Sequence, residues 1–171
     1  MTDPAERSSA VTRSPTRRSS WFGLSAVVVA AVTVGQVSVL GLLVSATGGI
    51  VFAVGLFRAR ERVVTFGAAV VVTGALVAGL EGSSIGPVLI AATAGVLAWD
   101  FATVAIDLGE QLGRETDTGR IETVHAFGSV LVGFVTIVVG YGVYLSATEN
   151  QPTVAVVLLL VSATVLAAAL K

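Results

Sequence analysis

Long runs of apolar residues alternate along this chain with short polar segments. The runs occupy residues 21–57, 63–80, 88–106, 123–147 and 153–170, and the only acidic residue inside them is Asp100. They show neither the two-residue alternation of a half-buried strand nor the one-sided period of a surface helix. A helix that is apolar on every side needs lipid or a very large core. Because a chain of 171 residues cannot build such a core, the pattern predicts membrane-spanning segments.

These segments are expected to be helices, because an unpaired backbone group in hydrocarbon costs several kcal/mol and only helices and closed barrels avoid that cost. The strands of a barrel would alternate polar and apolar residues, which these runs do not. One helical span needs about 20 residues. The 37 residues of 21–57 therefore predict two short helices that are joined by a turn near 37–41.

The pattern as a whole predicts an all-α, polytopic membrane helix bundle with six transmembrane helices in a single domain, 21–171. Residues 1–20 are polar and rich in Ser and Arg, which favours a disordered cytoplasmic tail. Residues 107–122 form a polar connector. Pairs of small residues at four-residue spacing, such as Gly74/Ala78 and Ser129/Gly133, favour close helix contacts in lipid. The predicted spans are 21–38, 40–57, 63–80, 88–106, 123–147 and 153–170.

The distribution of cationic residues supports six spans. With six, all ten Lys and Arg residues fall on one side of the membrane, in the tail, the 58–62 loop, the 107–122 connector and Lys171. Five spans would place the arginines of the tail on the opposite side from the others. Cationic residues concentrate in cytoplasmic loops. We therefore predict a multi-pass protein of the cell membrane with both termini in the cytoplasm.

Composition narrows the classes of function. A net charge of −1 gives no general attraction to nucleic acid. The absence of Cys removes disulfides, thiolate nucleophiles and Cys-ligated metal sites. No nucleophile–base pair or metal-ligand motif stands out, so we expect no catalytic residues, no bound metal or cofactor and no enzyme activity. Nine Arg against a single Lys favours a salt-loving or GC-rich source.

Asp100 is the most informative single residue. It follows Pro87 by 13 positions, which places it about 20 Å along the fourth span. A charged Asp inside a span costs about 2.5–3.5 kcal/mol, so it should face the bundle, where the neighbouring indole N–H of Trp99 offers a partner. The functional hypothesis is a proton or cation site. The structural hypothesis, which one isolated acid favours, is a hydrogen bond that fixes helix packing.

A second group of polar residues flanks the predicted connector. Asp107, Glu110 and Arg114 share one helical face, and Glu122 and His125 share another. If the helices turn near 115–117, Asp107 should face His125 and Glu110 should face Glu122, with Arg114 and Arg120 able to bridge them. The group could relay protons through His125 or hold two helices together by ion pairs, and we favour the second. The predicted polar cluster comprises Asp100, Asp107, Glu110, Arg114, Arg120, Glu122 and His125.

Residues 139–142 read Val-Gly-Tyr-Gly and resemble the filter of potassium channels. Val138 stands where the filter has threonine. A re-entrant loop at this point would also move Arg114 and Arg120 to the outer side. We therefore predict an ordinary helix here.

Several polar positions carry a family resemblance: Trp99-Asp100, the stretch 108–114, Thr118, Arg120, Glu122 and Val124-His125. Together with the spacing of the apolar runs, they resemble a haloarchaeal family of small multi-span membrane proteins of unknown function. Members are often encoded beside a MoxR-type AAA ATPase and beside von Willebrand- or transglutaminase-like membrane proteins. The resemblance implies an accessory role in a membrane assembly and provides no catalytic residues.

The sequence thus predicts a structural or accessory subunit, with the lipid bilayer, other membrane proteins or an AAA ATPase system as partners and no nucleic acid. The alternative is a small transporter or proton-coupled permease. That alternative would use Asp100, Asp107 and Glu110 together with His125.

Overall fold

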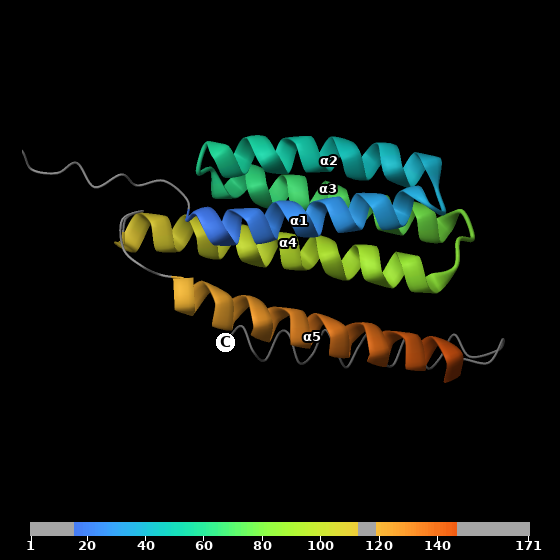
Figure 1. The fold of residues 1–171 in the computed structure, drawn as a ribbon. Coiled ribbons are helices and arrows are strands. Elements are labelled where there is room, and N and C mark those ends of the chain that lie inside the picture. Colours follow the sequence, from blue (N-terminus) through green and yellow to red (C-terminus); the bar gives the residue numbers. More distant parts are fainter. Residues whose placement is uncertain (1–15, 113–118, 147–171) are drawn as a thin grey trace, which may run out of the picture. The chain divides into compact units, whose positions relative to one another are not determined.

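In the computed structural model, residues 16–112 and 119–146 are described, and this part of the chain consists of helices joined by short turns, with no strand. Each described helix is long and apolar enough to cross a membrane. The predicted sixth span, 153–170, lies outside the described residues. Figure 1 shows the five helices, which are α1 (Arg17–Gly35), α2 (Val39–Phe57), α3 (Glu61–Leu80), α4 (Ile85–Leu112) and α5 (Gly119–Ser146).

The chain divides into two compact units, Met1–Ile137 and Val138–Lys171. The first contains α1 to α4 and most of α5. In the second, the last part of α5 pairs the rings of Tyr141 and Tyr144, whose centroids are 6.4 Å apart. The backbone is helical through 139–142, which confirms a helix in place of a filter loop.

The predicted division of 21–57 into two helices is confirmed. Helix α1 ends at Gly35 and α2 begins at Val39. Ser38 stops one helix and starts the next, because its extended backbone breaks the helical run and its Oγ accepts the N–H of Gly41 at 2.7 Å. This is the usual role of a serine at a helix N-cap.

The helices extend further at their polar ends than predicted. Helix α1 begins at Arg17, inside the predicted disordered tail, and α4 continues to Leu112. Because α5 begins at Gly119, residues 107–112 and 119–122 of the predicted connector belong to helices, and 113–118 lie outside the described residues. A helix satisfies its own backbone hydrogen bonds, so it need not end where the apolar run ends, and polar side chains can be solvated on its surface. The first polar residues therefore show where an apolar run ends, but the helix can continue beyond them.

Helices α2 and α3 pack backbone against backbone. A Cβ added at Gly48 would lie 2.6 Å from the backbone N of Val71, and one at Gly67 would overlap the backbone of Phe52. At Gly74 it would overlap the Oγ of Ser45. Small residues allow this approach, which maximises dispersion contacts where lipid removes the hydrophobic driving force between helices.

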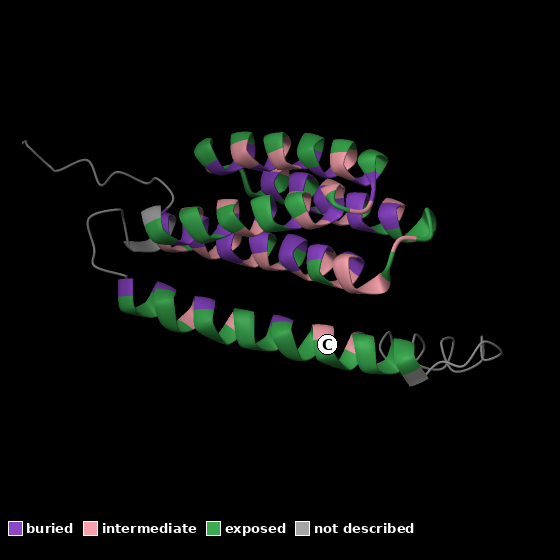
Figure 2. Cartoon of the chain, turned by 45° about the vertical axis from the view of Figure 1, so that its right-hand side comes forward, coloured by how far each residue is buried: buried purple, intermediate pink, exposed green. Residues whose placement is uncertain are grey.

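The interior of the bundle is formed by α1 to α4. Phe52, Leu56, Val34, Val64 and Val71 are the largest fully buried apolar side chains there. By contrast, α5 is largely exposed (Figure 2): 11% of its apolar window is buried, against 33–44% for the other four helices. Side-chain hydrogen bonds therefore matter more for holding α5 than for holding α1 to α4.

The two ends of the bundle differ in charge. At one end, Ser38 Oγ donates to Glu81 at 2.5 Å and Ser83 Oγ donates to the carbonyl of Val37, which joins the α1–α2 and α3–α4 turns. At the other end, the N–H of Thr16 bonds the carbonyl of Ala105 at 2.9 Å. The arginines of the described residues all lie at this second end: Arg17, Arg18, Arg58, Arg60, Arg62 and Arg120.

Candidate functional site

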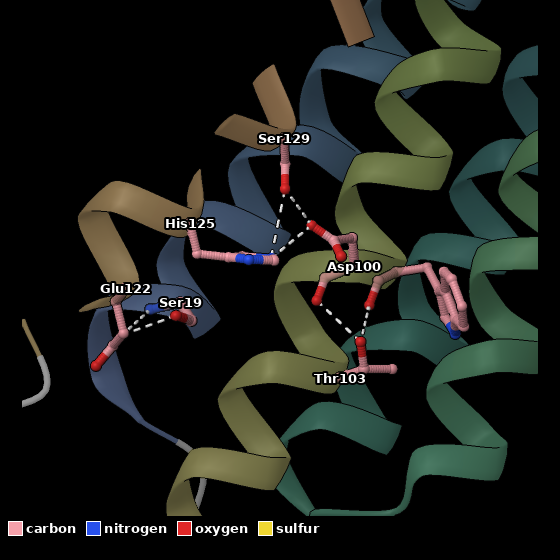
Figure 3. A network of polar contacts seen from close by, with 7 residues as sticks. Ser19, Asp100, Thr103, Glu122, His125 and Ser129 are labelled. Carbon is pink, nitrogen blue, oxygen red and sulfur yellow. Dashed lines mark hydrogen bonds and ion pairs between the residues drawn. The ribbon is translucent and has the colours of Figure 1, made fainter. Parts of the chain in front are cut away.

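The carboxylate of Asp100 lies at the centre of a polar contact between α4 and α5 (Figure 3). Its Oδ2 is 2.9 Å from Nε2 of His125 and accepts a hydrogen bond from Ser129 Oγ at 2.6 Å. His125 and Ser129 are one helical turn apart, so the same face of α5 presents both. The interaction is an ion pair when the imidazole carries a second proton. The prediction that Asp100 faces a neighbouring helix is confirmed.

The arrangement differs from a nucleophilic triad even though it contains Ser, His and Asp. In a triad, the carboxylate and the hydroxyl bind opposite nitrogens of the imidazole. Here both lie at the same nitrogen, with Ser129 Oγ 3.4 Å from His125 Nε2. The hydroxyl donates its hydrogen bond to Asp100 and not to the imidazole. In this geometry the imidazole and the hydroxyl both bind the Asp100 carboxylate, and the imidazole does not accept the proton of the serine hydroxyl.

The residues beside Asp100 attach α4 to α3 and support the backbone. The indole Nε1 of Trp99 donates to Thr65 Oγ1 of α3 at 3.1 Å, so its partner is in the bundle but is not Asp100. Thr103 Oγ1 donates to the carbonyl of Asp100 at 2.9 Å. Side-chain hydrogen bonds of Trp99 and Thr103 therefore flank Asp100 along α4.

Glu122 forms a second polar contact, between α5 and α1. Its side chain is buried, and its Oε2 accepts three hydrogen bonds: from Thr16 Oγ1 at 3.1 Å, from Ser19 Oγ at 2.8 Å and from the N–H of Ser19 at 2.7 Å. Thr16, the N-cap residue of α1, makes no side-chain capping bond to its own helix. A carboxylate from another helix thus satisfies an N–H of the first turn and complements the helix dipole.

Five of the seven residues of the predicted cluster have described side chains, and these five do not form a single cluster. Asp100 and His125 are together, while Glu122 binds α1. Asp107 and Arg120 are exposed. The side chain of Glu110 and all of Arg114 lie outside the described residues. The described residues therefore do not form one cluster at the mouth of the α4–α5 hairpin.

The predicted pairing of His125 with Asp107 is wrong, because the imidazole bonds Asp100, seven residues earlier on α4. The prediction assumed that residues equidistant from the turn lie level with each other. The actual register is shifted by about 10 Å, at 1.5 Å per residue. The position of Gly133 agrees with this shift, since a Cβ there would lie 3.0 Å from Thr93 and 3.1 Å from Leu97.

Ser129, Thr16 and Ser19 bind the two carboxylates but are not among the predicted site residues. The sequence pattern indicates Ser129 only as half of the small-residue pair Ser129/Gly133. Its spacing of four from His125 was an available signal, because residues i and i+4 share a helical face. Nothing in the local sequence pairs Thr16 and Ser19 with Glu122, more than 100 residues away.

A groove of about 680 Å³ runs between α3, α4 and α5 beside Asp100. Its walls are mostly aliphatic, and include Val72, Val96 and Val132. Asp100, His125 and Ser129 lie on its wall at the end nearer the arginines. The side chains of Asp100 and His125 are 31% and 37% exposed. Within the described ranges, no three His, Cys, Asp or Glu side chains come together in a way that could hold a metal ion.

The fold and the site define the class as helical membrane proteins: five described helices could span a bilayer, and polar side chains join helices to one another. The chain belongs to the Family of unknown function (DUF7519), whose profile matches residues 13–167. No curated protein and no solved structure matches it significantly.

Proposed function

We propose that this protein is a structural or accessory subunit of an assembly in the cell membrane and has no catalytic activity of its own. One observation carries the proposal: three acidic side chains each connect separate elements. Glu81 joins the α3–α4 turn to the α1–α2 turn, Glu122 joins α5 to α1, and Asp100 joins α4 to α5.

The energetics favour a packing role for these acids. Hydrogen bonds between transmembrane helices contribute about 0.6–2 kcal/mol each, and acids that lose them inside a membrane become costly. The interface of α2 and α3, where Gly67 and Gly74 leave no space for a Cβ, adds a rigid pair of helices. A unit of this kind resists internal rearrangement and suits a subunit that supports others.

The proposal includes six spans with both termini in the cytoplasm. Residues 153–170 have the length and composition of a further span. The arginines of the described residues lie at one end of the bundle, as the rule for cytoplasmic loops requires. The skew toward arginine supports a salt-loving archaeal source, and an AAA ATPase system is the partner that the family resemblance suggests.

Purification of the tagged chain from its native membrane in a mild detergent tests the accessory role. We expect a second membrane protein to co-purify in a fixed ratio, and Asp100→Asn to retain it, since an amide oxygen still accepts the bonds from His125 and Ser129. A single monodisperse monomer, with no companion under any mild extraction, would contradict the role.

A small proton-coupled transporter is the second candidate, and the groove beside Asp100 and His125 favours it. An acid and a histidine that share a hydrogen bond inside a membrane segment are common elements of proton pathways. This function predicts proton or cation flux in proteoliposomes that Asp100→Asn abolishes. If neither the wild type nor the variant moves ions down an imposed gradient, the transporter hypothesis is rejected.

A further inference from the structure

We infer that the α3–α4–α5 groove binds a neutral long-chain alcohol, with the hydroxyl of the ligand donating to Asp100 and its hydrocarbon chain lying along α4 and α5. This inference does not depend on the accessory role. It begins from the carboxylate itself. Oδ2 of Asp100 takes both hydrogen bonds described for the side chain, while Oδ1 accepts none from the described residues.

An oxygen of this kind needs a donor if lipid surrounds it. The Asp100 side chain is 31% exposed, on the wall of a groove whose lining is mostly aliphatic. Figure 3 shows the carboxylate between His125 and Ser129. A polar atom that faces hydrocarbon instead of water and lacks a hydrogen bond costs several kcal/mol. A ligand that donates one hydrogen bond to Oδ1 removes that cost.

The shape of the groove fits a hydrocarbon chain. Along α4 it extends from Leu89 to Asp100, and along α5 from Val124 to Thr136. Eleven residues of helix span about 16 Å, which suits an extended chain and not a compact polar metabolite. Gly128 of α5 lines the groove and leaves space there, because a Cβ at this position would have no atom within 4 Å.

The depth of Asp100 selects a small head group. Asp107, which is exposed, lies seven residues further toward the arginine end, about 10 Å along the helix. A phosphate-bearing head stays at the interface, since charged groups are costly below it. A hydroxyl is uncharged and can lie at the level of Asp100.

The cost of charge in hydrocarbon also favours a neutral head. An ammonium or carboxylate head at the level of Asp100 would lie below the interface, where a charged group is costly. An O–H donor needs no charge to complete the site. A free amine or a fatty acid is therefore expected to bind more weakly than the alcohol of the same chain length.

Trp99 provides a direct assay, because it lines the groove. The chain has two tryptophans, so Trp21→Phe makes Trp99 the only indole. Reconstituted in nanodiscs, this variant is titrated with hexadecanol that carries bromine along its chain, which quenches nearby indoles. We expect saturable quenching at a low mole fraction. A brominated alkane without the hydroxyl should quench only in proportion to its concentration in the lipid.

Two further substitutions, each in the Trp21→Phe background, separate the head from the chain. Asp100→Ala should weaken binding about tenfold, the effect of one hydrogen bond to a charged group. Gly128→Leu should abolish saturation by filling the groove while leaving Asp100 and His125 in place. Ala46→Leu, the same kind of enlargement at an exposed position of α2, is the matched control and should bind like the parent.

Several results would overturn the inference. Equal quenching by the alkane and the alcohol would mean simple partition into lipid. Stronger binding of the brominated amine or acid would reject the neutral head. Unchanged affinity in both Asp100→Ala and Gly128→Leu would place the ligand elsewhere.

Discussion

At the residue scale, the three acids that join separate elements, Glu81, Asp100 and Glu122, each accept a hydrogen bond from a serine hydroxyl. Ser38 donates to Glu81, Ser129 to Asp100, and Ser19 to Glu122. A serine hydroxyl is small and neutral, so it can enter the membrane at little cost, and its bond to a carboxylate is stronger than one between neutral groups. His125 is the exception, because it can also provide a charge.

Glu122 offers the clearest test at this scale. Glu122→Ala would leave the N–H of Ser19 and two buried hydroxyl groups without their shared acceptor. We expect a loss of about 2–4 kcal/mol in the free energy of unfolding, since each unsatisfied buried donor costs about 1–3 kcal/mol. Denaturant unfolding in detergent micelles would measure it.

Glu61→Ala is the control for this substitution. Glu61 is an exposed acid in the first turn of α3, so its removal should cost less than about 1 kcal/mol, the scale of a helix-dipole interaction. Equal effects of the two alanine substitutions would show that Glu122 does not connect α5 to α1 in the way the contacts indicate.

At the scale of elements, the helices are held in two ways. Helices α2 and α3 use small residues and close backbones, whereas α5 uses carboxylates and their donors. The difference follows from burial, since α5 contributes few side chains to the core. A substitution that adds volume should therefore affect the first pair, and one that removes a hydrogen bond should affect α5.

Gly74 and Gly79 of α3 allow a matched comparison. A Cβ at Gly74 would lie 2.7 Å from the carbonyl of Gly41 and 2.8 Å from the backbone N of Ser45. Because the backbone cannot yield as a side chain can, Gly74→Ala should destabilise the protein by about 1–3 kcal/mol. At Gly79, the nearest atom to an added Cβ is a methyl of Val88 at 3.5 Å, an ordinary contact.

Gly79→Ala should therefore be neutral or should stabilise the helix by up to about 1 kcal/mol, through helix propensity. The unfolding transitions of both variants in the same micelles give the comparison. A similar stability for the two variants would mean that α2 and α3 can separate at no cost, contrary to the close backbone approach described above.

At the scale of the whole molecule, the distribution of charge along the described helices defines two chemically different ends. Glu81 lies at one end with Ser38, and the arginines from α1, α3, α5 and the α2–α3 turn lie at the other. Moving guanidinium groups across hydrocarbon is costly, so the chain should insert with that end in the cytoplasm.

Reporters of sidedness test this orientation in living cells. We expect reporters at the N-terminus and in the 58–62 loop to lie in the cytoplasm, and one in the 81–87 turn to lie outside. A reporter after Lys171 should be cytoplasmic if there are six spans and outside if there are five. The orientation would be refuted if the N-terminus and the 81–87 turn reported the same compartment.

The sequence predicted the helices better than their contacts. The turn within 21–57 was predictable because 37 uncharged residues exceed one span, and Ser38 could cap the second helix. The pairing of His125 was not predictable in the same way. Its partner depends on how far α5 slides along α4, and both Asp100 and Asp107 lay on a plausible face.

Sequence alone thus determined the helical class of the described residues, the five helices long and apolar enough to cross a membrane, and the gathering of the described arginines at one end. These properties follow from the local cost of placing apolar, polar or charged groups in lipid, which each segment carries independently of its neighbours. Only the tertiary structure decided that Asp100 meets His125 and Ser129, that Glu122 caps α1, and that a groove opens beside them. Those contacts depend on the register between helices. The register is set by how the side chains of two segments pack together, so it cannot be predicted from either segment alone.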